Sequence, residues 1–285
     1  AALIPTLETT QALAYGTAEA EAGPIASRKA AQSGDITRTR DRFDWQAGPG
    51  WMMLDYDPPK GSEPVDRDGF LQLVAEVWPQ VLDAPAVVGD SGTSYIYHAT
   101  TGEQVKGRGG LRLYVLVADA RDIKRAGETL HRRLWLAGYG YYEVSKSGAL
   151  LNRSPVDAAV WQPERLDFAA GAACCKPLEQ HRPECDARND DAEPISTTDT
   201  LPNLTSDENR TLRELEAQAA GDVKPMQEQA RQKWVDDRLA EAADDDEARS
   251  RLTDAVENHR LYGDFELIHS SGKAVTVGVV MDSPS

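Results

Sequence analysis

The chain has 285 residues, a hydrophobic content of 40%, 27% charged residues and a formal net charge of −16. This length allows one large domain or two smaller ones with an ample core, and no apolar run approaches the roughly 20 residues of a membrane span. Three cysteines are too few for a disulfide framework, and the N-terminus lacks the charged and apolar segments of a signal peptide. These features predict a cytoplasmic protein without a membrane partner.

The excess acid is concentrated in the C-terminal part. Residues 1–170 carry 18 Lys and Arg against 22 Asp and Glu, a net charge of −4, whereas residues 171–285 carry 13 against 25, a net charge of −12. The basic residues of the first part occur in short local groups. This distribution excludes a broad basic DNA-binding face but leaves room for a small cationic groove.

The first half begins with residues 1–35, which are rich in Ala, Gly, Ser and Thr and predict a lead-in segment. A strand or strand pair is expected over 43–57. Apolar residues at helical spacing predict a helix over 70–81 that begins near Asp66, and a short strand is expected at 86–88.

Further along, 111–118 predicts a buried strand and 121–137 an amphipathic helix, and strands are expected at 144–151, 156–160 and 165–168. Helices and strands alternate, but the connections are short and hairpin-like. This pattern favours an α+β fold over a doubly wound sheet.

The C-terminal part predicts a linker over 186–205, because Asp, Asn, Pro, Ser and Thr dominate there. Thr205 or Ser206, with Glu208 nearby, predicts a helix cap. A small helical accessory module with a terminal hairpin is expected over 206–285, with helices at 206–220, 224–243 and 245–260 and strands at 265–268 and 275–280.

The most informative segment is an apolar run that ends in two acids, Asp55 and Asp57. Side chains alternate along a strand, so both acids point to one face, and Pro58 and Pro59 end the strand there. Paired carboxylates are the oxygen ligands that Mg²⁺ and Mn²⁺ prefer. A strand that ends in a solvated acidic turn would have the same pattern.

Gly-rich and basic segments follow the acid pair. Glycines at 107–110 precede a strand that carries Arg112, and such glycines let backbone amides approach a phosphate. A later strand carries a third acid, Asp167. Together these are the components of a site for a metal-bound nucleoside triphosphate, and the further candidate phosphate contacts are Ser91, Ser94, Lys146 and Arg153. Each basic residue could equally be an ordinary surface or ion-pairing residue.

Three segments, Leu54-Asp55-Tyr56-Asp57, 109–114 and 165–168, resemble the three motifs of archaeo-eukaryotic primases. The likeness is closest to the primase-polymerases of plasmids, phages and integrative elements, and it covers about residues 35–175. It implies a catalytic domain over 36–185, with an RRM-like sheet, a second small α/β half and the active site between them. It also implies template-dependent nucleotidyl transfer from NTP or dNTP, with single-stranded DNA and a replicative helicase or further C-terminal domain as partners.

By this resemblance, Asp55, Asp57 and Asp167 are the catalytic acids that bind two Mg²⁺ or Mn²⁺ ions. The second motif of the family usually has Ser-x-His, and Arg112 stands where the His is expected. Arginine can also hold a phosphate, and bidentately. The departure leaves open a catalytically silent DNA-binding or scaffolding homologue, and three acids would also suit a metal-dependent nuclease.

Two further groups of residues have candidate roles. Arg38, Arg40 and Arg42 would lie on one face of an extended segment and could contact template phosphates. Thiolate and imidazole ligands are gathered within twelve residues, at Cys174, Cys175, His181 and Cys185. Zinc sites prefer separated cysteine pairs, so this spacing argues against zinc.

Overall fold

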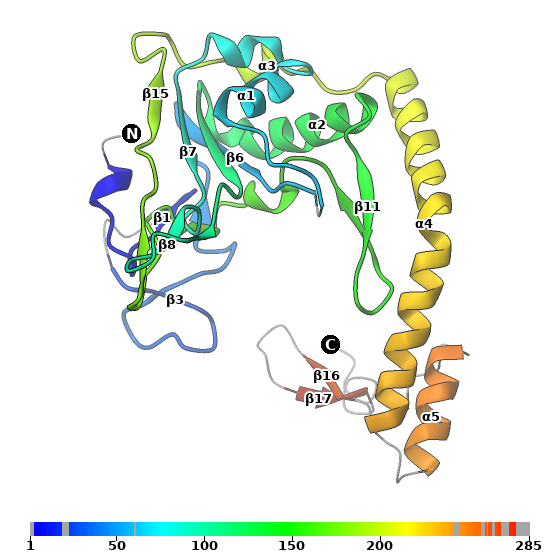
Figure 1. The fold of residues 1–285 in the computed structure, drawn as a ribbon. Helices are drawn as coiled ribbons and strands as arrows, with labels where there is room; N and C mark the ends of the chain where they lie inside the picture. Colours follow the sequence, from blue (N-terminus) through cyan, green and yellow to red (C-terminus); the bar gives the residue numbers. More distant parts are fainter. Residues whose placement is uncertain are drawn as a thin grey trace. The chain divides into compact units, whose positions relative to one another are not determined.

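The structure is a computed structural model that describes residues 3–18, 23–59, 61–241, 246–257, 260, 262–263, 266–268 and 274–277 (Figure 1). The chain divides into two compact units. The first comprises Ala1–Gly23, Arg38–Tyr141 and Asn152–Glu216, and the second comprises Pro24–Thr37, Tyr142–Leu151 and Ala217–Ser285. The fold is of mixed α+β type, with several small sheets and a few helices, as the sequence predicts.

The first unit is built on a four-stranded sheet with the order β15-β7-β10-β6. Its strands are β6 (Gly50–Tyr56), β7 (Ala86–Asp90), β10 (Leu111–Val117) and β15 (Asp186–Arg188). Strand β10 is antiparallel to both β6 and β7, so these two run parallel to each other with β10 between them. The apolar strand β10 therefore lies between β6 and β7, and β6 forms one edge of the sheet.

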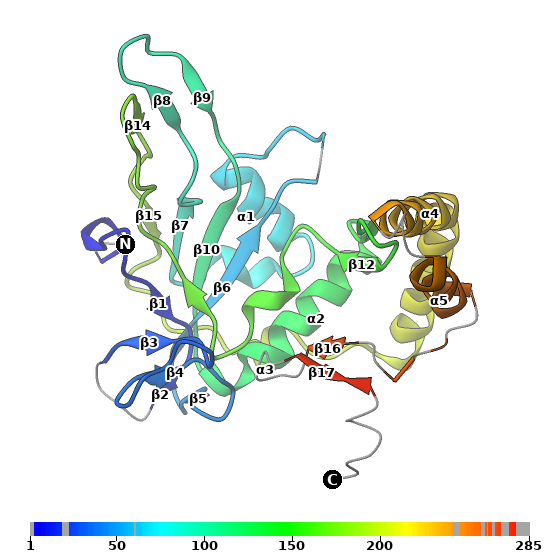
Figure 2. The same cartoon turned by 90° about the horizontal axis from the view of Figure 1, so that it is seen from below.

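The two faces of this sheet differ in chemistry because side chains alternate along each strand. One face carries Met52, Leu54, Leu113 and Val115, which are fully buried. Helices α1 (Arg67–Ala75) and α2 (Ile123–Leu136) lie on this side (Figure 2) and contribute buried side chains to the same core. The opposite face carries the polar and aromatic side chains of the candidate site.

The chain also contains several short paired strands and short helices. Strand β1 (Leu13–Ala14) pairs with β13 (Leu166–Asp167), β2 (Thr17–Ala18) with β5 (Phe43–Asp44), and β11 (Tyr141–Val144) with β12 (Leu150–Arg153). A three-stranded sheet contains β8 (Ile96–His98), β9 (Gln104–Lys106) and β14 (Leu178–Gln180). The short helices are η1 (Ile4–Thr6), η2 (Pro79–Leu82), η3 (Ala120–Asp122), η4 (Ala158–Val160) and α3 (Thr197–Thr200).

The second unit contains the parallel pair β3 (Ile25–Ala26) and β4 (Ile36–Thr37), helix α5 (Asp246–Glu257), and the antiparallel pair β16 (Glu266–Ile268) and β17 (Ala274–Thr276). Helix α4 (Ser206–Glu241) begins in the first unit and continues into the second. No helix within the described ranges has both the length and the apolar composition needed to cross a membrane. The predicted terminal hairpin is confirmed at β16 and β17, and 269–273 and 278–285 lie outside the described residues.

The predicted helix cap before α4 is confirmed as a reciprocal pair of hydrogen bonds. The Glu208 backbone N–H donates to Thr205 Oγ1 at 3.2 Å, and the Thr205 N–H donates to Glu208 Oε2 at 2.7 Å. The predicted break between 206–220 and 224–243 is wrong, because α4 continues through Pro225. A proline removes one backbone hydrogen bond, and the rest of this 36-residue helix is retained.

Several other boundaries differ from the sequence prediction for local reasons. The helix expected over 70–81 ends at Ala75, and Pro79 begins a separate 3-10 turn. The strand expected over 144–151 is a hairpin, whose turn includes Gly148 at φ +79° and a hydrogen bond from the Ala149 N–H to Ser145 Oγ at 2.9 Å. The stretch expected over 156–160 as a strand contains η4 instead, which is capped by the Asp157 carboxylate.

Residues 186–205, expected as a linker, contribute β15 to the edge of the main sheet and helix α3 to the first unit. Leu201 is fully buried in the core of this unit. The polar composition of the stretch fits its exposed positions, while a few apolar side chains attach it to the sheet.

Leu130→Ala should strongly destabilise the protein, because Leu130 is fully buried on α2. Removing such a side chain leaves a cavity and typically costs about 2–5 kcal/mol. Urea unfolding followed by circular dichroism measures this cost. Val105→Ala, at an exposed position of β9, is the matched control and should change the free energy of unfolding by less than about 0.5 kcal/mol. Equal effects of the two substitutions would contradict the core described here.

Candidate active site

The candidate site contains one pair of oppositely charged residues that face each other on neighbouring strands. Asp55 on β6 lies directly opposite Arg112 on β10 in the antiparallel register. Arg112 Nε is 4.0 Å from Asp55 Oδ1, and the two side chains are 17% and 24% exposed. Opposite charges at facing positions stabilise an antiparallel pair, and the pair lies on the sheet face away from α1 and α2.

Asp167 joins this pair from outside the main sheet. Its strand, β13, pairs with β1 near the N-terminus. The Asp167 side chain is fully buried, and Arg112 Nη1 lies 2.7 Å from its Oδ1. The Tyr114 hydroxyl donates a short hydrogen bond to Asp167 Oδ2. Asp167 therefore interacts with two neighbouring side chains of the same face of β10.

The contact between Arg112 and Asp167 is electrostatic rather than a well-aligned hydrogen bond. Although the two atoms are 2.7 Å apart, Asp167 Oδ1 has no hydrogen-bond partner in the described part of the chain. Arg112 Nη1 instead donates to the Phe168 carbonyl at 3.0 Å. Arg112 Nε is also buried without a hydrogen-bond partner among the described residues. The Arg112 Nε–H thus remains available for a further hydrogen-bond partner, which buried polar groups usually have.

The electrostatics of the site reflect several acids around one arginine. The pKa of Asp55 is raised to about 6, chiefly by burial; Arg112 opposes the shift, and the charges of Asp57, Asp157 and Asp167 contribute to it. Burial lowers the pKa of Arg112, but nearby Asp167, with Tyr114 and Asp55, outweighs this effect and raises the pKa above its usual value. The guanidinium therefore stays charged, whereas Asp55 exchanges its proton near neutral pH.

Asp57 follows β6 and is exposed. It lies beside Gly110, which precedes β10: a Cβ at Gly110 would meet Asp57 Oδ1 at 3.1 Å and the Tyr56 carbonyl oxygen at 2.5 Å. The close approach of these two strand ends therefore requires glycine at position 110. The glycine-rich segment thus packs against the acid pair, as its position before the strand suggests.

The residues present fit a divalent cation only in part. Asp55 and Asp57 are accessible carboxylates, whereas both oxygens of Asp167 lie against Tyr114 or Arg112. Within the described ranges no group of three or more His, Cys, Asp or Glu side chains is placed to hold a metal ion. Mg²⁺ is commonly bound by one or two carboxylates and completed by phosphates and water. The pair Asp55 and Asp57 suits that mode of binding.

Ser91 and Ser94 stabilise the glycine-rich segment. Their hydroxyl oxygens are 3.0 Å apart, Ser94 is fully buried, and Ser94 Oγ accepts a hydrogen bond from the Gly109 N–H at 3.2 Å.

Arg153 ends β12 and is half-buried, whereas Lys146 is exposed in the β11–β12 turn, which belongs to the second unit. Phosphate binding by these residues stays a prediction.

The three arginines proposed for template binding, Arg38, Arg40 and Arg42, are exposed. They do not lie in an extended segment as predicted, because the chain turns there and the Arg42 N–H donates to the Thr39 carbonyl at 3.0 Å. Arg40 also forms an ion pair with Glu164 at 3.0 Å. The three side chains therefore lack the single-face arrangement that was expected from their spacing.

The Cys and His residues have separate surroundings. A Cβ at Gly89 would meet Cys185 Sγ at 2.5 Å, so Cys185 packs on β7. His181 Nε2 lies 2.8 Å from Glu179 Oε1. Cys174 is half-buried and Cys175 is exposed.

Sequence reasoning missed three residues of the site: Tyr15, Tyr114 and Asp157. Tyr114 could have been found, because it lies two positions after Arg112 on the same strand face. Burial, followed by the charge of Asp167, raises the pKa of Tyr15 and of Tyr114, so both hydroxyls stay protonated. Tyr15 reaches the site through the pairing of β1 with β13, for which the sequence gives no local signal.

Comparisons of the chain with protein-family models, with curated proteins and with solved structures find no match.

Asp55→Asn should become more stabilising as the pH rises. The pKa of Asp55 is about 6 in the folded protein against an ordinary value of 3.8. The folded chain therefore binds more protons than the unfolded chain between these values, and wild type loses stability as the pH rises through this window. The asparagine variant lacks this loss.

Urea unfolding in EDTA at pH 4.5 and 7.5 tests this expectation. The difference in free energy of unfolding between Asp55→Asn and wild type should shift by about 2 kcal/mol in favour of the variant at the higher pH. Glu103→Gln, at an exposed position, controls for the loss of one charge and should show a much smaller shift. An unchanged difference for Asp55→Asn would contradict the raised pKa.

Asp167→Asn should destabilise the protein far more than an equivalent change at the surface. It would leave Arg112, whose side chain is only 17% exposed, without its buried counter-charge, and breaking a buried ion pair costs about 3–5 kcal/mol. Asp68→Asn removes an acid that pairs with Arg188 at 2.6 Å but is 77% exposed, so it should cost less than about 1 kcal/mol. Chemical denaturation of both variants measures the difference, and similar costs would show that the Asp167 contact is not structural.

Proposed function

We propose that the protein is a primase-polymerase, which transfers a nucleotide from NTP or dNTP to the 3′-hydroxyl of a growing strand on a single-stranded DNA template and releases pyrophosphate. The observation that carries the proposal is the facing pair of Asp55 and Arg112, with Asp57 exposed at the end of the same strand. Carboxylates for a divalent cation beside a guanidinium for phosphate are what a metal-bound triphosphate requires. The proposed setting is the replication protein of a mobile element, with a replicative helicase or further C-terminal domain as partner.

The order of elements in the first unit supports this proposal. Strands and helices β6, α1, β7, β10, α2 and β15 follow one another in a β-α-β-β-α-β sequence, although shorter elements intervene. The central position of β10 between β6 and β7 is that of a split β-α-β unit, whereas the last strand, β15, differs from the RRM-like order because it pairs with β7 and not with β6. An RRM-like sheet within a primase-like core, followed by a helical accessory module, is therefore part of the proposal.

Each residue of the site has a role in the proposed mechanism. Asp55 and Asp57 would hold Mg²⁺ or Mn²⁺, which when bound lowers the pKa of the attacking hydroxyl and offsets the charge of the phosphates. Arg112 would orient a phosphate oxygen through its unpaired Nε–H. Asp167 and Tyr114 would keep the guanidinium in place, so that little reorganisation is needed during the reaction.

A catalytically silent domain that binds nucleotide or DNA is the second candidate. The observation that favours it is the engagement of Asp167 by Arg112 and Tyr114, which leaves two accessible acids where the resemblance implies three metal ligands. Such a domain would bind triphosphate without incorporating it.

Template-dependent incorporation of labelled nucleotides, with Mg²⁺ or Mn²⁺ and a primed single-stranded template, tests the proposal. The double variant Asp55→Asn/Asp57→Asn should lose activity by about 10²- to 10³-fold or more, because groups that offset charge in the transition state are removed. The matched control is Asp68→Asn/Glu103→Gln, which removes two exposed acids away from the site. It should retain wild-type activity.

Each other outcome points to a different function. Full activity in the Asp55/Asp57 variant would place the chemistry elsewhere. Folded wild type that binds triphosphate without incorporating it would favour the silent domain. Release of nucleotides from labelled DNA without added triphosphate would instead identify a metal-dependent nuclease.

A further inference from the structure

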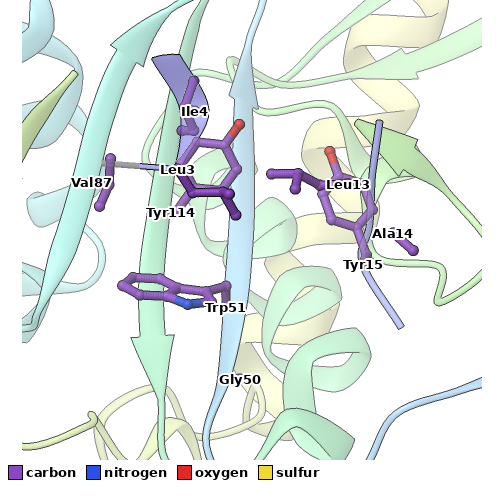
Figure 3. Close-up of a pocket in the computed structure, with 9 residues that line it drawn as sticks. All are labelled: Leu3, Ile4, Leu13, Ala14, Tyr15, Gly50, Trp51, Val87 and Tyr114. Atoms are coloured by element: carbon purple, nitrogen blue, oxygen red, sulfur yellow. The ribbon is translucent and has the colours of Figure 1, made fainter. Parts of the chain in front are cut away.

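An apolar cavity of about 360 Å³ opens on the same sheet face as the candidate active site (Figure 3). Three aromatic side chains line it: Trp51 from β6, Tyr114 from β10 and Tyr15, which follows β1. Aliphatic side chains of Leu13 and Val87 complete much of the wall. The volume lies within the range of ligand pockets, roughly 300–1,000 Å³.

The cavity and the charged site share one side chain, that of Tyr114. Tyr114 lines the cavity, while its hydroxyl donates to Asp167 in the charged site. Trp51 and Asp55 lie on one face of β6, four positions apart, which corresponds to about 13 Å along a strand. An elongated ligand could therefore place an apolar end beside Trp51 and an anionic end beside Arg112.

Trp51 has a large exposed apolar surface in this cavity that a bound ligand would cover. Trp51 is 47% exposed on β6, which is an edge strand of the main sheet, whereas the next residues of the strand, Met52 to Leu54, are buried. Exposed tryptophan on a concave apolar surface is typical of binding sites. Nucleobases suit such a wall, because every base has a π-face that stacks on an aromatic side chain.

We propose that this cavity binds the nucleobase of the nucleoside triphosphate whose phosphates lie at Asp55, Asp57 and Arg112. The proposal rests on the proposed function and specifies how the same site holds its substrate. Its walls are mainly apolar, and stacking is tolerant of base identity. The cavity therefore contributes affinity for any base, and selection among bases is left to the template strand.

Calorimetric titration with ATP and with inorganic tripolyphosphate, both in the presence of Mn²⁺, tests this pocket. Wild type should bind ATP roughly 5- to 150-fold more tightly than tripolyphosphate, the range that one stacked base provides. Trp51→Ala should lower ATP affinity by that factor and leave tripolyphosphate affinity unchanged, whereas Trp51→Phe should retain most of the ATP affinity. Leu82→Ala, at another exposed apolar position, should match wild type with both ligands.

The two ligands separate failure of the pocket from failure of the proposed function. Equal affinity of wild type for ATP and tripolyphosphate, or an unchanged ATP affinity in Trp51→Ala, would overturn the base pocket and leave triphosphate binding intact. Binding of neither ligand by wild type would overturn both. Unchanged tripolyphosphate binding by Trp51→Ala also shows that this variant is folded at the charged site.

Discussion

The buried contact between Arg112 and Asp167 is the interaction on which the site depends. Both charges are largely removed from water, and such charges are tolerated only when they are paired. The pairing holds β13, and through it β1, against the open face of the main sheet. It also directs the guanidinium toward Asp55 on the neighbouring strand. Residues far apart in the sequence are thereby held in one cluster by a single counter-charge.

The register of the main sheet makes this cluster possible. On β10, Leu113 faces the helices and is fully buried, while Arg112 and Tyr114 face away from them. A shift of one residue would turn the arginine into the helix-packed core and expose the leucine. The burial of apolar side chains under α1 and α2 therefore also determines which polar groups meet on the other face. Stability of the core and geometry of the site have the same physical origin.

Local signals in the sequence predict the central elements well. The strand at 111–118 and the helix at 121–137 are found within one or two residues of their expected bounds, since their apolar spacing matches what the core requires. The contacts of Asp167 could not be predicted, because they depend on the pairing of β13 with a strand about 150 residues earlier. The hairpin turn around Gly148 and the turn at Arg42 were also missed, since both depend on local backbone hydrogen bonds rather than on side-chain periodicity.

Under the proposed function, the charge balance of the site favours joint binding of a cation and a polyphosphate. Asp57, Asp157 and Asp167 all raise the pKa of Asp55, and Arg112 opposes them. A bare polyphosphate would add negative charge to this acidic group, whereas a bare divalent cation would have the carboxylates of Asp55 and Asp57 as ligands but no phosphate oxygens. The polyphosphate would supply oxygen ligands to the cation, and the cation would offset the negative charge of the polyphosphate. Binding of one would therefore raise the affinity for the other by the same factor. Because a cation would bind the deprotonated Asp55 carboxylate, whose pKa is about 6, the affinity for the cation should increase as the pH rises through this value.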